Sequence, residues 1–132
     1  MEKMKIMLVD DEERFLATTK KLLLKRGYEA LTATSGTEAL EKLKSHLVHV
    51  VILDVKMPGM DGTATLREIK KLFPHIEVIV LTGRATVESA VECLEAGATD
   101  YVMKPCDIDD LLKTAEEAFE KRQRLKENSR QE

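Results

Sequence analysis

The 132-residue sequence lacks several features that membrane, secreted or metal-thiolate proteins need. Its two cysteines, Cys93 and Cys106, form neither a C-x-x-C pair nor a spacing typical of a zinc site, so a reducing compartment fits best. No apolar run approaches the length of a membrane span, and the N-terminal apolar stretch is too short for a signal sequence. We therefore expect a cytoplasmic protein without membrane contacts.

Positive charge is not in excess either. The formal net charge is −3 at pH 7, which argues against a broad electrostatic surface for nucleic acid. Hydrophobic residues make up 43% of the chain and charged residues 34%, a balance typical of a globular domain. The sequence contains no internal repeat and no glycine-rich loop that would cradle a nucleotide. We expect one domain that does not itself bind nucleic acid.

Strand-like and helix-like segments alternate five times along the chain. Strands are predicted at about 5–9, 28–33, 49–54, 77–82 and 99–103, and helices at about 12–26, 36–46, 62–73, 86–96 and 108–122. Such alternation predicts an α/β fold in which helical crossovers join parallel strands and cover both faces of the sheet. The strand at 49–54 is apolar at consecutive positions, as a central strand buried on both faces requires.

Turn and capping residues mark several helix boundaries. Gly27 and Gly97 each follow a helical stripe, at the place where a left-handed cap ends a helix. Ser35 begins a capping box before the second helix, and Asp107 is the predicted N-cap of the last one.

Polar side chains stand at the ends of four predicted strands. Asp10, Asp54, Thr82 and Lys104 each end or follow an apolar run. A charge at such a core boundary is costly unless another group compensates it. In open parallel sheets, ligands bind beyond the carboxyl ends of the strands. We therefore expect these residues to converge on one site.

Acidic residues dominate that site. Asp10 and Asp11 lie where the first strand meets the first helix, and Asp54 would lie beside them. Two carboxylates 4 Å apart repel by roughly 4 kcal/mol at an effective dielectric of 20, so such a cluster should raise a pKa or recruit a cation. A few carboxylates with remaining positions open to water and phosphate oxygens are typical of Mg²⁺ sites.

Lys104 and Thr82 then fit as donors to an incoming anion, although Lys104 alone would also make an ordinary salt bridge and Thr82 an ordinary turn cap. Acids, a metal, a lysine and a hydroxyl indicate phosphoryl transfer. No residue is placed as a base to activate water, which leaves Asp54 as the candidate nucleophile. The phosphoryl group would then reside on the protein, which would not be an enzyme acting on another substrate.

In these residues the chain resembles the receiver domain of bacterial two-component response regulators. The resemblance covers about residues 4–121, and the segments that carry it are Asp10-Asp11, Asp54, Met57-Pro58-Gly59-Met60-Asp61-Gly62, Thr82-Gly83 and Lys104-Pro105. It implies a flavodoxin-like three-layer sandwich with five helices and a five-stranded sheet of order 2-1-3-4-5. It also implies a cis bond between Lys104 and Pro105.

The resemblance assigns roles to individual residues. Asp54 would be phosphorylated by a sensor histidine kinase, a phosphotransfer protein or, slowly, a small phosphodonor. Asp11 would bind Mg²⁺ directly and Asp10 through water, with the backbone carbonyl of Lys56 as a further ligand. Lys104 and Thr82 would bind the phosphoryl oxygens. Tyr101 would be a switch residue that turns inward together with Thr82.

The resemblance implies a signalling switch whose changing surface, formed by the fourth helix, the fifth strand and the fifth helix, controls an output partner and supports a homodimer. A receiver cut from a larger DNA-binding regulator is the alternative. A flavodoxin-like electron carrier and a haloacid-dehalogenase-type phosphatase are more distant, since the acids at 10–13 would repel a flavin phosphate and Lys56 replaces the second acid of the phosphatase. We expect the receiver at 1–122, followed at 123–132 by a helix extension, frayed tail or linker.

Overall fold

The computed structural model describes residues 3–56, 62–83 and 86–131. The strands are β1 (Ile6–Val9), β2 (Ala30–Ala33), β3 (Val50–Leu53), β4 (Glu77–Thr82) and β5 (Asp100–Met103). The helices are α1 (Glu13–Lys25), α2 (Gly36–Leu43), α3 (Gly62–Leu72), α4 (Val87–Glu95) and α5 (Ile108–Gln131). The predicted alternation of strands and helices is confirmed.

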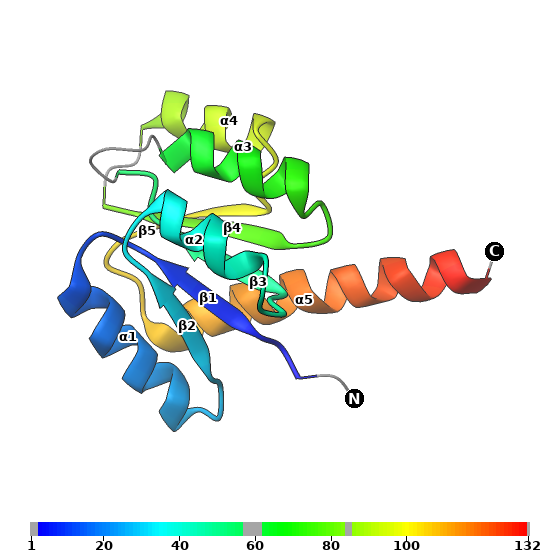
Figure 1. Ribbon diagram of the computed structural model, residues 1–132, viewed down its shortest axis with the longest axis horizontal. Coiled ribbons are helices and arrows are strands. Elements are labelled where there is room, and N and C mark those ends of the chain that lie inside the picture. Colours follow the sequence, from blue (N-terminus) through cyan, green and yellow to red (C-terminus); the bar gives the residue numbers. More distant parts are fainter. Residues whose placement is uncertain (1–2, 57–61, 84–85, 132) are drawn as a thin grey trace.

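The strands form one parallel sheet in the order β2-β1-β3-β4-β5, with helices on both faces (Figure 1). On one face, α2, α3 and α4 pack against alternate residues of the strands, and on the other face α1 and α5 do so. All four residues of the central strand β3 are buried, which explains why this strand is apolar at consecutive positions. The predicted α/β fold and strand order are confirmed.

The predicted caps are present. Gly27 and Gly97 adopt φ angles of 86° and 109°, which favour glycine. The Ser35 side chain accepts a hydrogen bond from the backbone N–H of Glu38, although the Glu38 carboxylate turns to Thr34 rather than completing the capping box. Asp107 Oδ1 accepts the backbone N–H of Asp109 at 2.9 Å.

Three predicted boundaries were wrong. β2 begins at Ala30 rather than near 28, because the N–H of Tyr28 is bonded to the carbonyl of Leu23 at the end of α1. α2 ends at Leu43 rather than near 46, since the next two N–H groups bond three residues back and tighten the turn. α5 continues to Gln131 instead of ending near 122. Of the endings considered for the chain, the structure shows a helix extension.

An ion pair connects α5 to the sheet at the amino ends of the strands, away from the carboxyl ends. Arg122 Nη2 lies 2.6 Å from Oε1 of Glu77, the first residue of β4, and Glu77 also accepts a hydrogen bond from Thr99. Lys70 on α3 donates to the backbone carbonyl of Ile76 at 2.7 Å, and burial lowers the pKa of this lysine.

Within the described part of the chain, no helix combines the length and the apolar character that a membrane crossing needs.

Candidate functional site

The carboxyl ends of four adjacent strands bring the predicted site residues together. Asp10 follows β1, Asp54 follows β3, Thr82 ends β4 and Lys104 follows β5. Backbone hydrogen bonds fix these ends, because the N–H of Asp54 donates to the carbonyl of Val9 at 2.9 Å and the N–H of Lys104 donates to the carbonyl of Thr82 at 2.8 Å. The Thr82 side chain lies at the same carboxyl end of the sheet and is fully buried.

The Lys104 ammonium lies between two carboxylates. Its Nζ is 2.6 Å from Asp10 Oδ2 and 3.3 Å from Asp54 Oδ2. Burial alone would lower the pKa of Lys104, but the hydrogen bond and the charge of Asp10, together with the charge of Asp54, outweigh burial and raise it. Lys104 therefore carries a fixed positive charge beside Asp54, and its shorter contact is with Asp10.

Three carboxylates form the acidic cluster. Asp10, Asp11 and Asp54 each offer an oxygen, and these oxygens lie within 4.8 Å of one another. Asp10 is 2% exposed and Asp54 8% exposed, whereas Asp11 faces solvent. Burial raises the pKa of Asp10; hydrogen bonds from Lys104 and from the N–H of Glu12 lower it only in part, and the charge of Asp54 raises it further.

The donor set of this cluster fits a hard divalent cation. Among the described residues, three carboxylate oxygens at this spacing meet one lysine ammonium, so their negative charge exceeds its positive charge. One of the three carboxylates opens to solvent, which leaves room for the water ligands that Mg²⁺ retains. The residues present can therefore hold such an ion.

Comparison with known proteins agrees with this geometry. The response regulator receiver domain family matches residues 6–116. The chain belongs to this family. The receiver is 44% identical over 114 residues to the transcriptional regulatory protein ZraR of Escherichia coli K12, covering 86% of this chain and 26% of that protein. It is 36% identical over 114 residues to the E. coli K12 DNA-binding transcriptional regulator NtrC, covering 86% of this chain and 24% of that protein.

A solved structure has the same fold. The CheY-like receiver domain protein of Methanospirillum hungatei JF-1 superposes with a TM-score of 0.88 at 35% identity, covering 93% of this chain and 98% of that one. By contrast, the receiver spans only about a quarter of the length of the curated relatives it matches. The shared part is therefore the receiver domain itself.

Two further predicted residues lie next to the site. The backbone N–H of Lys56 donates to Asp54 Oδ1 at 2.8 Å, which fixes one oxygen of that carboxylate. Tyr101 is half-buried on β5, and its hydroxyl lies 3.3 Å from Ser89 Oγ on α4. The metal-ligand role of Lys56 and the switch role of Tyr101 remain predictions. The segment Met57–Asp61, which also carries the resemblance, lies outside the described residues.

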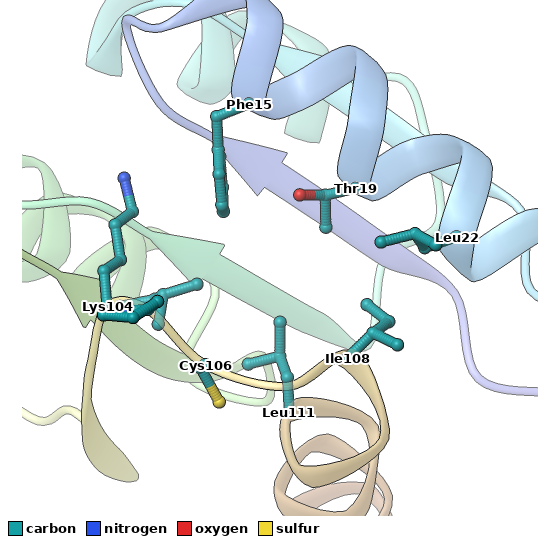
Figure 2. Close-up of a pocket in the computed structure, with 9 residues that line it drawn as sticks. Phe15, Thr19, Leu22, Lys104, Cys106, Ile108 and Leu111 are labelled. Carbon is teal, nitrogen blue, oxygen red and sulfur yellow. The ribbon is translucent and has the colours of Figure 1, made fainter.

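One close neighbour of Lys104, the ring of Phe15, was not predicted from the sequence. The ring of Phe15, on the first turn of α1, has its centroid 4.2 Å from Lys104 Nζ. Figure 2 shows Phe15 reaching from α1 into the pocket, with the Lys104 side chain beside it. An aromatic residue one turn after an acidic pair only weakly indicates a contact with the site lysine, since the fold of the chain decides which way the ring faces. The cis bond predicted between Lys104 and Pro105 is present.

The raised pKa of Asp10 predicts that its ionised carboxylate lowers the stability of the folded protein. In the presence of EDTA at pH 7, Asp10→Asn should increase the free energy of unfolding by on the order of 1 kcal/mol, because a neutral amide of the same shape replaces a buried charge. A folded-state pKa above the unfolded one means that protonation favours folding. The advantage of Asp10→Asn should therefore shrink as pH falls through the folded-state pKa toward the unfolded value.

Urea unfolding at a series of pH values would measure this difference. Asp100→Asn, at an exposed aspartate on β5, is the matched control and should show no comparable gain. A lower stability of Asp10→Asn than of the wild type at pH 7 in EDTA would mean that the Lys104 ion pair outweighs burial.

Proposed function

We propose that this receiver domain is a phosphorylation-dependent switch in which Asp54 accepts the phosphoryl group from a phosphohistidine of a sensor histidine kinase or phosphotransfer protein. The supporting observation is the position of Asp54. It stands at the end of the central strand, with one oxygen held by the N–H of Lys56 and the other 3.3 Å from the Lys104 ammonium. The neighbouring acids give the pocket its capacity for a cation.

In the proposed transfer, an oxygen of Asp54 forms a bond to phosphorus while the bond from phosphorus to the donor imidazole nitrogen breaks. The electron pair of the broken bond stays on the imidazole, which takes a proton from solvent. Lys104 offsets the charge of the phosphoryl oxygens, and the Thr82 hydroxyl donates to one of them. Because the phosphoryl group stays on Asp54, the domain assists only its own phosphorylation and dephosphorylation and is not an enzyme for another substrate.

Mg²⁺ is the proposed cofactor. The carboxylates of Asp10, Asp11 and Asp54 and the backbone carbonyl of Lys56 would hold it, and when bound it supplies positive charge to the phosphoryl oxygens. Asp10 and Asp11 position that charge beside the acceptor rather than reacting themselves.

The proposed output surface consists of α4, β5 and α5. Tyr101 joins β5 to α4 through Ser89, so a move of Thr82 toward a phosphoryl oxygen would change the space available to Tyr101 in the adjacent strand. The surface carries exposed apolar side chains at Val87, Val91, Leu94 and Met103. We propose that it contacts the output partner and forms a homodimer. If phosphorylation shifts the receiver between two conformations from a ratio of 1:99 to 99:1, it must stabilise one conformation over the other by about 5.5 kcal/mol.

A second form of this function is that the receiver controls a larger cytoplasmic transcriptional regulator. Its support is that ZraR and NtrC, each about four times as long as the matched segment, are named as transcriptional regulators. In this form, residues 1–122 are the receiver and 123–132 connect it to the output domain. With a net charge of −3, the receiver would leave DNA binding to that domain.

The proposed chemistry is tested by incubating the purified wild-type protein with acetyl phosphate. We expect the mass of one phosphoryl group to be added in the presence of Mg²⁺ and to map by peptide mass spectrometry to the peptide containing Asp54. The same incubation in EDTA should give little product. Labelling at another carboxylate, or equal labelling in EDTA, would contradict the proposal.

A further inference from the structure

The Lys104 ammonium has a third contact besides its two carboxylates. Its Nζ lies 4.2 Å from the centroid of the Phe15 ring, a distance at which the face of an aromatic ring attracts a cation. The Lys104 side chain is only 20% exposed, so water screens this attraction less than it would on an open surface. Phe15 itself is half-buried and packs against the core between the sheet, α1 and α5.

The ring differs from the other two contacts because it carries no net charge and takes no part in phosphoryl chemistry. Asp10 and Asp54 both belong to the acidic cluster, so a cation bound there competes with Lys104 for them. Asp54 also loses its carboxylate charge when it becomes an acyl phosphate. Neither event changes the charge or the chemistry of the Phe15 ring.

The fold places Phe15 independently of Lys104. Asp10 Oδ1 accepts the backbone N–H of Glu12 at 2.9 Å, which sets the turn from β1 into α1, and buried Leu16 anchors the next position of the helix. Phe15 therefore forms one wall of a cavity of about 410 Å³ between α1 and the start of α5, and Lys104 lies at the same cavity (Figure 2). The ring is therefore a surface set by the fold, against which the Lys104 ammonium lies.

We propose that Phe15 is a positioning residue for phosphorylation of Asp54: its ring supports the Lys104 ammonium so that, while paired with Asp10, it keeps its contact with Asp54 and faces the incoming phosphoryl oxygens. This role rests on the proposed function of Asp54. The ammonium already lies closer to Asp10, at 2.6 Å, than to Asp54, at 3.3 Å, so loss of the ring would leave Asp10 as the stronger of its two remaining partners.

The substitution Phe15→Leu keeps an apolar side chain but removes the ring. We expect phosphorylation by acetyl phosphate with Mg²⁺ to slow by about two- to thirtyfold, the range into which cation–π energies convert. Phe15→Trp, which restores the ring face, should recover at least half of the wild-type rate. Leu22→Ala removes apolar surface from the same helix and the same cavity and is the matched control, with a rate within about twofold of wild type.

Proton NMR supplies a readout that does not depend on phosphorylation. In the wild type without Mg²⁺, the Lys104 Cε protons should show an upfield ring-current shift that Phe15→Leu abolishes and Leu22→Ala preserves. Equal rates for wild type and Phe15→Leu, or equal slowing in Phe15→Trp or Leu22→Ala, would overturn the positioning role. A wild type that takes up no phosphoryl group would instead overturn the proposed function, and the role of Phe15 with it.

Discussion

Asp54→Asn is expected to abolish phosphorylation of the receiver while leaving its fold intact. The amide lacks the anionic oxygen that would attack phosphorus, so no covalent product should form with acetyl phosphate and Mg²⁺. The substitution keeps the size of the side chain and an oxygen that accepts the N–H of Lys56. Lys104 keeps its shorter contact, the one with Asp10.

Stability separates this loss of chemistry from a loss of structure. Removing one of three clustered negative charges should leave the urea midpoint of Asp54→Asn equal to or above that of the wild type in EDTA. An unfolded variant would also fail to be phosphorylated, so the midpoint has to be measured on the same preparation. Asp100→Asn is again the control, and it should be phosphorylated at the wild-type rate.

Two-dimensional amide NMR extends the same test to the output surface. Beryllofluoride with Mg²⁺ should shift wild-type signals in α4, β5 and α5 as well as near the acids, and Asp54→Asn should show neither set of shifts. A stable aspartyl-phosphate signal in Asp54→Asn equal to the wild type would refute Asp54 as the acceptor. Wild-type shifts confined to the acid cluster would refute the output surface.

The convergence of Asp10, Asp54 and Lys104 was predictable because it follows from local patterns. Each residue stands next to a run of apolar residues, and parallel strands present their carboxyl ends at one edge. The helix caps at Gly27, Gly97 and Ser35 were likewise predictable, since each depends on a few neighbouring residues. The strand order came from the resemblance, because alternation alone fits more than one order.

Contacts between distant segments were not predictable. Glu77 and Arg122 are 45 residues apart, and only the packed sheet and α5 bring them together. The place of Phe15 against Lys104 depends on the rotation of α1 and on the side-chain conformations of both residues. The continuation of α5 to Gln131 was one of three endings that the sequence left open, since its last part offers few apolar residues to mark a buried face.

Gly62→Ala is expected to destabilise the receiver strongly, although helix propensity predicts the opposite. Gly62 begins α3 and is buried. A Cβ atom at this position would lie 2.2 Å from the Cα of Val55 and 2.5 Å from its carbonyl oxygen. Both are backbone atoms, so no side-chain rotation relieves the overlap.

The expected cost is about 3 kcal/mol, the upper end of what overpacking usually costs. It should outweigh the gain of roughly 1 kcal/mol that alanine normally has over glycine in a helix. Gly83→Ala is the matched control, because a Cβ there meets no atom of the described residues within 4 Å and its φ is not left-handed. Gly83→Ala should change the free energy of unfolding by less than about 1 kcal/mol. Urea unfolding followed by circular dichroism measures both variants.

The effect of Gly62→Ala should also reach the site. Val55 directly follows Asp54, and the next N–H, that of Lys56, holds Asp54 Oδ1. Any displacement of the Val55 backbone by the new methyl group therefore moves the acceptor carboxylate relative to Lys104. We expect folded Gly62→Ala protein, assayed below its unfolding midpoint, to be phosphorylated more slowly than Gly83→Ala. Wild-type stability in Gly62→Ala would show that the two backbones do not approach so closely, and glycine would then not be required where α3 begins.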